Sequence, residues 1–546
     1  MKQILLYCSI LFAGALTFTG CENALDARHI DPDGFTDAQI EYLYSQGATK
    51  SIDNDYGTFY TQVFGLIDVY TQAIAIESGE GRASIYNISD DQGRWGYYYI
   101  TQMQEFAEID KIYNYKLSAE EQANYAPFIQ TKNILAAYNT ATASDFFGSM
   151  PYSEAWGIRD QLYGKTGTLT PKYDPQQDIY NSILNNLKTA AAYLKTAKLD
   201  PNITLQSTVF PKQDIVYAGN LSKWYKLANS FLLRYAMRIS NVDEAKAKDV
   251  LSGLSLSDLI TVNADNAYVW RLNTANTSNG IWRAIMDRAN NTYFLYAPKF
   301  MVETMSAASD PRLGIFYQSA SNQGGDEITI GAPIVPYPSS AADAKAIQQT
   351  LLPTQLRAKY GVINSTTFRK NFKGLPNGVG ITASDVYFLL AEAKMRNLLP
   401  AAFTGTAEDY YNSGIILSIQ EFYNYYIKSD YTLKNTAVTA LNVSDATLKT
   451  WLSASAYKYD SSKALEQIAL QKWIHTGILQ PFETWAEYRR LDLPALSPDV
   501  DGGVTLNSSS NRPVRFLYPA TEINMNGGNV PIADNDPKKR LWWDTK

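Results

Sequence analysis

Cysteine and histidine are scarce in this chain. Of 546 residues, two are cysteine (Cys8 and Cys21) and two are histidine (His29 and His475). Because no cysteine follows Cys21, the rest of the chain can form neither a disulfide nor a thiolate metal site. Ser-His-Asp and Cys-His catalytic systems need a histidine, as do most zinc sites. His29 lies in a polar N-terminal segment and His475 in an apolar-patterned helix, where packing is the simpler interpretation.

Glycine-rich nucleotide loops are also missing. The sequence GKT at 164–166 resembles the end of a phosphate loop, but the glycine required five residues earlier is replaced by Arg159. The formal net charge of −6 argues against binding to nucleic acid. We therefore expect no metal, no cofactor and no nucleic-acid partner.

Long apolar runs are absent except at the N terminus. Met1-Lys2 gives a positive start, and Ile4–Thr19 carries no charge. This layout is typical of a secretory signal, and it is too short to span a bilayer comfortably. Phe18–Cys21 resembles the lipobox of bacterial lipoproteins, in which the cysteine is acylated, for example with palmitate.

The N-terminal pattern therefore predicts a signal peptide over 1–20, a lipid anchor on Cys21 and a polar tether over 21–36. An ordinary cleaved signal with a chance cysteine is the alternative.

Aromatic residues are abundant, with 39 tyrosines and 10 tryptophans. With 45% apolar and 19% charged residues, the chain can bury a large core that uses some of these rings. Other rings can bind sugar, because the apolar face of a pyranose stacks on an aromatic ring and a tyrosine hydroxyl can bond to a sugar hydroxyl.

Helical periodicity begins near Asp37 and dominates the chain. Apolar residues recur at spacings of three and four over 178–194, 221–240, 382–397 and 462–479. Between about 255 and 380, Gly, Asn, Ser and Pro cluster, which predicts long loops with short strands at most. The pattern predicts one mainly α domain over 37–546 with a loop-rich region at about 255–380.

Six segments carry a family resemblance, and they occur in the family's order. They contain DFFGSMPYSEA, a DPQQDIY helix entry, LANSFLLRYAMR, YFLLAEAK, QKW with WAEYRR, and YPATEINMN. Their ranges are Asp145–Ala155, Pro171–Leu187, Trp224–Ile239, Ser384–Asn397, Ile468–Pro494 and Arg515–Asn526. Together they resemble the SusD/RagB family of nutrient-binding surface lipoproteins, in its SusD-like branch.

The resemblance implies a mainly α fold. In it, tetratricopeptide-like helix pairs form an α-α superhelix with loop-rich elaborations and few short strands. It also implies an outer-membrane lipoprotein that faces the cell surface and serves nutrient uptake. Such a protein holds an oligosaccharide, or in some members a peptide, and hands it to a TonB-dependent, SusC-like transporter. No catalysis belongs to that role.

Two other functions remain open. A glycan-degrading helical enzyme would place two carboxylates about 5–10 Å apart in a groove. A peptide-binding helical-repeat scaffold would show a concave aliphatic groove in place of flat exposed rings. The arginines Arg489 and Arg490 could contact a ligand, but pairing with Glu392 or Glu487 is the simpler expectation.

Ligand residues in this family come from variable loops, so the candidates rest on physics. The segment GRWGYYYI at 93–100 places rings beside glycines, and the second and third candidates lie in the loop-rich region. The candidates are Arg94, Trp95, Tyr97, Tyr98 and Tyr99, then Trp282, Tyr293 and Tyr296, then Trp270. Core packing is the alternative for every ring. We expect at least one of Trp95 and Trp282 to face solvent.

Overall fold

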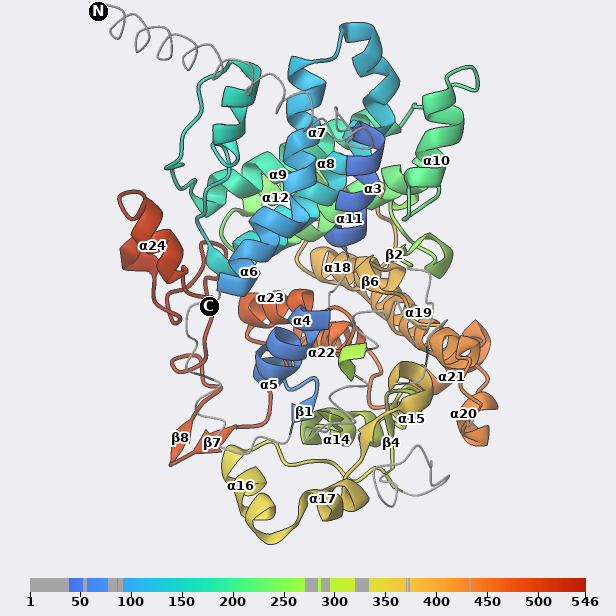
Figure 1. Cartoon of the computed structure of the whole chain (residues 1–546). Coiled ribbons are helices and arrows are strands. Elements are labelled where there is room, and N and C mark those ends of the chain that lie inside the picture. The colour runs from blue at the N-terminus through green and yellow to red at the C-terminus, as the bar shows by residue number, and fades with distance from the viewer. Residues whose placement is uncertain are drawn as a thin grey trace, which may run out of the picture.

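Helices make up most of the structure, a computed structural model (Figure 1). The mainly α fold expected from the sequence is therefore confirmed. The structure describes residues 39–52, 56–76, 86, 92–270, 283–285, 295–319, 333–369, 371, 374–432 and 434–546. The predicted signal peptide, Cys21 and the tether lie outside these residues.

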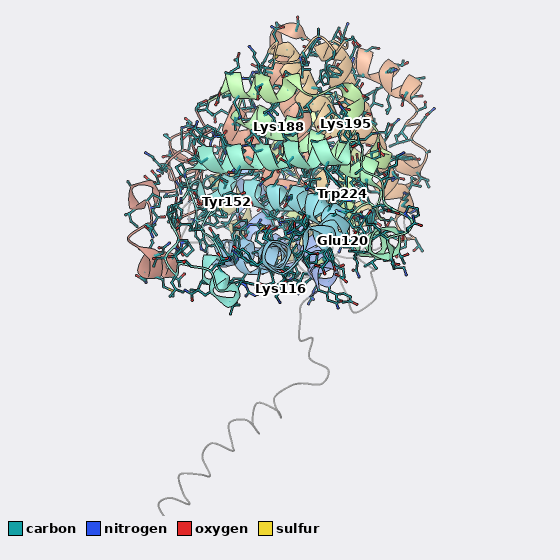
Figure 2. The ribbon with its side chains drawn as sticks, turned by 90° about the horizontal axis from the view of Figure 1, so that it is seen from above. Lys116, Glu120, Tyr152, Lys188, Lys195 and Trp224 are labelled. Carbon is teal, nitrogen blue, oxygen red and sulfur yellow. The ribbon has the colours of Figure 1, made fainter. Side chains whose placement is uncertain are left out.

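The N-terminal half is a layer of helices that pack against their sequence neighbours. Helix α3 packs on α7 and α8, α8 on α9, α9 on α11, and α11 on α12. Figure 2 looks onto this layer from above, where Lys188 and Lys195 mark α9 and Trp224 marks α11. The helices are α3 (Ile40–Ser51), α7 (Gln104–Tyr115), α8 (Ala119–Phe147), α9 (Gln176–Leu194), α11 (Leu221–Ile239) and α12 (Glu244–Ser252).

Local sequence explains where these helices begin. Ser118 caps α8, because its hydroxyl accepts from the Glu121 N–H while its own N–H donates to the Glu121 carboxylate. The Asn220 side chain caps α11 by accepting from the Lys223 N–H. Along α9, Ile183 and Leu187 lie on the predicted apolar stripe and are fully buried.

The C-terminal half holds a second set of packed helices. Helix α18 packs against α19 and α22, α22 packs against α23, and contacts between α18 and α11 join the two halves. The capping box of Thr382 and Asp385 predicted from the sequence is present. Gly414 is needed in α19, since an added Cβ would lie 2.6 Å from the Phe388 ring. The helices are α18 (Ala383–Met395), α19 (Ala407–Lys428), α21 (Asp445–Ala454), α22 (Ala464–Thr476) and α23 (Pro481–Leu491).

The region at 255–380 contains short antiparallel strands, as expected. Three of them, β3, β5 and β4, form a sheet with β1, which comes from residues 75–76 outside this region, in the order β1-β3-β5-β4. Strand β2 pairs with β6. The strands are β1 (Ala75–Ile76), β2 (Ala267–Val269), β3 (Leu295–Tyr296), β4 (Tyr317–Gln318), β5 (Val362–Ile363) and β6 (Gly378–Ile381). The region also contains helices that its Gly- and Pro-rich composition did not predict. They are α14 (Lys299–Ala307), α15 (Leu313–Phe316), α16 (Ala341–Thr350) and α17 (Pro353–Lys359).

Short elements complete the described chain. They are α4 (Tyr56–Thr58), α5 (Asp68–Thr71), α6 (Gln92–Gly96), α10 (Phe210–Gln213), α20 (Thr436–Thr439), α24 (Ala520–Asn526), β7 (Val500–Asp501) and β8 (Val504–Thr505). The π-helices are η1 (Phe59–Ile67), η3 (Tyr97–Gln102), η5 (Leu205–Val209) and η9 (Ser365–Arg369), and the 3₁₀-helices are η4 (Gly157–Tyr163), η6 (Leu256–Asp258), η7 (Asn263–Asp265), η10 (Ser461–Lys463) and η11 (Ile532–Asp534). Among the helices described, none combines the length and apolar character needed to cross a membrane.

Candidate functional site: an aromatic hollow

A hollow of about 520 Å³ opens on the flank where α6, η3, η4 and α24 come together. Helices α24 and α6 lie at the left of Figure 1. We call this feature the aromatic hollow, because Trp95, Tyr99 and Trp156 line it. Its volume is in the range of small-molecule sites. Its walls come from segments more than 400 residues apart in the sequence.

The three rings of the hollow brace one another. The Trp95 and Tyr99 centroids lie 5.0 Å apart, and those of Tyr99 and Trp156 lie 5.5 Å apart. Behind them, Phe147 meets Trp95 edge-on at 4.9 Å, and Tyr173 stacks on Trp95 at 6.2 Å. Such contacts hold the rings in place before a ligand arrives, which lowers the entropy cost of binding.

The polar tips of two rings are bonded within the protein. The Tyr99 hydroxyl donates to the Pro151 carbonyl at 2.7 Å, and the Trp156 indole N–H donates to the Tyr99 carbonyl at 3.1 Å. Burial raises the pKa of Tyr99 well above its usual value, so the hydroxyl keeps its proton. What Tyr99 and Trp156 offer a ligand is therefore ring surface. The indole N–H of Trp95 has no hydrogen-bond partner in the described part of the chain.

Trp156 has an unusual backbone. Its φ of 57° and ψ of 10° lie in the left-handed region. For a residue with a Cβ this conformation costs about 1–2 kcal/mol, and a bulky side chain is uncommon there. Such strain clusters at ligand sites, where the surrounding structure maintains it. The Trp156 indole is held in the hollow although glycine would suit its backbone better.

The rim of the hollow is aliphatic and exposed. Ile100, Leu169 and Met525 are 67%, 79% and 80% exposed, and all three line it. Exposed apolar side chains that gather in one place are typical of interaction surfaces, so this rim is a candidate contact surface.

Few polar groups complete the lining. Glu522 accepts hydrogen bonds from the Tyr173 hydroxyl (3.1 Å) and the Asn526 amide (2.9 Å), both on Oε1. Its second oxygen has no partner among the residues described. Arg159 is held by Glu108, with an Nε–Oε2 distance of 2.7 Å. Gln104 adds an exposed amide.

The structure places the candidate residues of the segment 93–100 in different environments. Trp95 and Tyr99 line the hollow, although Trp95 is only 8% exposed. Tyr98 is buried with its hydroxyl 3.1 Å from that of Thr140. Arg94 is also buried, with its guanidinium over the rings of Phe146 and Phe482 at 5.1 and 4.7 Å. The proposed sugar contacts of Arg94 and Tyr98 were therefore wrong, because both residues pack in the core. Tyr97, which lies under the Arg94 guanidinium, is half-buried outside the lining.

The other predicted ligand residues do not join the hollow. Tyr296 is fully buried and stacks on Tyr337 at 4.5 Å, so its assignment as a ligand residue was wrong. Trp270 is 44% exposed at the end of β2 and is not part of the lining. Trp282 and Tyr293 lie outside the described residues. We expected Trp95 or Trp282 to face solvent. Trp95 is largely buried, so the expectation stays a prediction for Trp282.

Sequence reasoning missed Trp156, Leu169 and Met525. Trp156 directly follows the PYSEA segment, and Met525 lies inside YPATEINMN. Both segments resembled family scaffold, so neither was considered for ligand binding. A tryptophan directly before a glycine at the end of a motif was the available signal.

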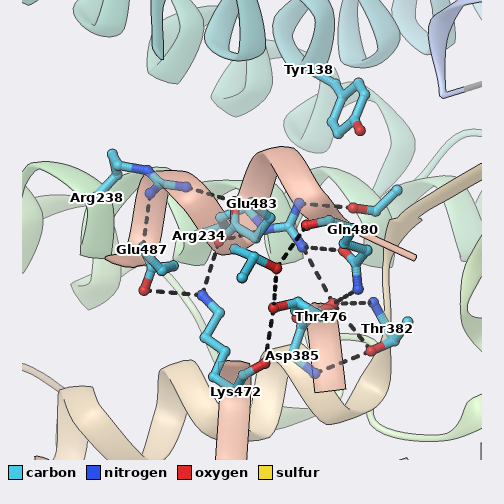
Figure 3. Close-up of polar contacts among 12 residues, drawn as sticks. Tyr138, Arg234, Arg238, Thr382, Asp385, Lys472, Thr476, Gln480, Glu483 and Glu487 are labelled. Carbon is cyan, nitrogen blue, oxygen red and sulfur yellow. Dashed lines mark hydrogen bonds and ion pairs between the residues drawn. The ribbon is translucent and has the colours of Figure 1, made fainter. Parts of the chain in front are cut away.

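The arginines of the family-like segments, Arg234, Arg238, Arg489 and Arg490, lie in a buried ionic network that we call the arginine network. Figure 3 shows its part around Arg234 and Arg238. Arg238 bonds to Glu483 at 2.6 Å, and Figure 3 draws this pair together with Lys472 and Glu487. Elsewhere in the network, Arg490 bonds to Glu392 (2.5 Å) and Glu487 (2.7 Å). Burial opposes the ionisation of Glu483, but Arg234, Arg238 and Lys472 outweigh it and lower its pKa to about 2. Arg489 donates to the carbonyls of Asp145 and Val514. The expectation of structural pairing is thus confirmed for Arg490, and neither Arg489 nor Arg490 is exposed to a ligand.

Comparison with known protein families identifies the family to which the chain belongs. A SusD-like family model, described as "Starch-binding associating with outer membrane", matches residues 36–519. The chain belongs to the SusD-like family.

Solved structures share the fold of this SusD-like protein. A chitin-binding protein has a TM-score of 0.70 at 22% identity, covering 93% of this chain and all of that one. A SusD homologue from Bacteroides fragilis gives 0.70 at 18%, covering 92% and 99%. A chitin-binding SusD homologue from Flavobacterium johnsoniae gives 0.67 at 20%, covering 93% and 99%. At these identities the likeness establishes the fold alone. No curated protein matches the sequence.

Proposed function

We propose that this SusD-like protein is a non-catalytic surface lipoprotein that captures an oligosaccharide in the aromatic hollow. The observation that carries the proposal is the set of braced rings Trp95, Tyr99 and Trp156 in one open hollow. The C–H face of a pyranose stacks on such rings, and the polar rim can bond to its substituents. Two structural relatives are named as chitin-binding, which is in line with a glycan ligand.

The lining of the hollow supports a binding role over hydrolysis. Glu522 is the one carboxylate among the lining residues in the described part of the chain, and Oε1 is already bonded to Tyr173 and Asn526. Glycoside hydrolysis uses a pair of carboxyl groups, about 5–10 Å apart, on either side of the scissile bond.

The remaining parts of the proposal concern location and partner. The lipobox-like Phe18–Cys21 supports an acylated Cys21 at an outer-membrane surface, and the family description supports that membrane. We assign transfer of the ligand to a SusC-like TonB-dependent transporter, on the family resemblance alone. Mass spectrometry of the mature N terminus tests the anchor, and co-purification from membranes tests the partner.

A saccharide screen tests the central claim. The purified protein should bind one class of oligosaccharide by calorimetry and release no new sugar on prolonged incubation. Trp156→Ala should weaken binding, whereas Trp270→Ala, which alters an exposed tryptophan outside the hollow, should leave it unchanged. Release of shorter sugars would indicate the hydrolase alternative. Tight binding of a peptide with no saccharide bound would indicate the peptide-binding scaffold.

A further inference from the structure

We infer that the aromatic hollow selects sugars that carry an N-acetyl group over fully hydroxylated sugars. This inference rests on the proposed function and names the class of ligand. It comes from an imbalance in the lining, where ring faces and aliphatic side chains far outnumber unbonded polar atoms.

The hollow offers more apolar surface than an unsubstituted hexose can cover with its own apolar face. One pyranose face covers one or two rings, but Ile100, Leu169 and Met525 add aliphatic surface around them. A plain hexose carries hydroxyls around its whole edge. Hydroxyls pressed against these three side chains would lose water without gaining a partner, which weakens binding. A methyl group at the same place gains free energy from leaving water.

The polar groups of the lining match the hydrogen-bonding groups of an amide. An acetamido group presents one N–H donor and one carbonyl acceptor. Oε2 of Glu522, which has no partner among the described residues, can accept from that N–H, whereas Oε1 is already bonded within the protein. The indole N–H of Trp95, which has no partner among the residues described, or the amide of Gln104 can donate to the carbonyl. One acceptor and two donors beside apolar surface fit this group better than a ring of hydroxyls.

The charges of the lining also favour a neutral N-acetylated sugar. Arg159, the one cation among the described lining residues, is neutralised by Glu108, with an Nη2–Oε2 distance of 2.6 Å. Glu522 therefore leaves the described lining with net negative character. Acidic sugars would be repelled, whereas a neutral N-acetylated sugar meets no charge penalty.

Matched trisaccharides test the inference on the full-length chain. The probes are the β1→4 trimers of N-acetylglucosamine, glucose and glucosamine, which differ only at carbon 2, with a glycan array run in parallel. We expect the N-acetylated trimer to bind at least 10-fold tighter than the glucose trimer, and array hits to carry N-acetyl groups. The glucosamine trimer separates the acetyl effect from attraction of a cation to Glu522.

Variants of the rim sharpen the test. Leu169→Ser and Met525→Ser alter exposed side chains and should leave the fold intact. Both should lower affinity for the N-acetylated trimer and leave the glucose trimer nearly unchanged, so the ratio falls toward one. Leu352→Ser, an equally simple change at a 66% exposed leucine elsewhere, is the control and should preserve the ratio.

Each result decides a different claim. Equal affinity for the N-acetylated and glucose trimers, or array hits without N-acetyl groups, would overturn this inference and leave glycan binding standing. Tighter binding of the glucosamine trimer would also overturn it, in favour of charge recognition. Binding of no saccharide at all would overturn the proposed function with it.

Discussion

The arginine network and the aromatic hollow are both built from residue types that can bind ligands, but only the hollow leaves such side chains accessible. In the network every guanidinium faces carboxylates or carbonyls at hydrogen-bond distance, as Arg490 does with Glu392 and Glu487. In the hollow, Tyr99 and Trp156 bond their polar tips inward and leave their ring faces open. The comparison teaches that accessible and unpaired surface, and not residue type, distinguishes a candidate binding site from a structural cluster.

Substitutions in the two regions should also have different consequences, one for stability and the other for ligand affinity. A buried charge that loses its partner destabilises the whole protein. A ring in the wall of an open hollow mainly affects what binds there. Experiments on stability and on affinity can therefore separate them.

The largest effect is expected in the arginine network. Arg490→Met should lower the free energy of unfolding by about 3–5 kcal/mol, because Glu392 and Glu487 would stay buried without their shared cation. Urea denaturation measures it. The control, Lys248→Met, breaks the exposed pair with Glu244 and should produce no measurable change. A small loss for Arg490→Met would show that the network is not a structural unit.

The next effect depends on pH. Burial raises the pKa of Glu421 to about 7, against a usual value of 4.5. In this window the folded carboxyl keeps a proton that the unfolded one has lost, so stability falls as the pH rises from about 4.5 to 7. The shift corresponds to about 3 kcal/mol. Glu421→Gln mimics the protonated group, so it should unfold later than the parent at pH 8 and nearly together with it at pH 4.

His475 provides the check on that pH dependence. Burial lowers its pKa to about 4, so its contribution is lost as the pH falls from 6.5 toward 4, opposite in sign to that of Glu421. Thermal unfolding across the range should therefore be flattest at pH 5–6, where the two slopes oppose each other. If Glu421→Gln were destabilising at every pH, Glu421 would be ionised in the folded protein.

The smallest of these effects belongs to the hollow. Trp156→Gly relieves the left-handed backbone but removes the indole, and affinity for the bound saccharide should fall about 10- to 100-fold, or about 1.4–2.7 kcal/mol. Trp156→Phe keeps a ring face and should lose less. Calorimetry on both variants measures the difference. If Trp156→Gly bound as well as the parent, the strained ring would have no role in binding.

Much of the fold was predictable from local pattern. The apolar stripes of α9 and α11 and the capping box at Thr382 appear as expected, because helix periodicity and caps depend on residues a few positions apart. The helices between 299 and 359 were not predicted, because Gly, Asn, Ser and Pro cluster in the segments around them and led to the expectation of loops for the whole region.

Less of the site was predictable. Trp95 and Tyr99 were identified in a segment dense in rings, but Arg94 and Tyr98 beside them point into the core. Adjacent residues on a helix face different sides, so composition alone cannot assign exposure. Leu169 and Met525 carry no local signal, because an exposed aliphatic side chain has meaning only beside the rings it joins.

By itself the sequence determined the helical architecture, the scarcity of cysteine and histidine chemistry, and the membership in the SusD-like family. These depend on residue identity and spacing along the chain. Only the tertiary structure decided which arginines are sealed in ion pairs and which rings keep an open face. Both depend on which distant segments come together around a side chain, as α24 and the rings at 95–99 do where they line one hollow, and no single stretch of sequence encodes that proximity.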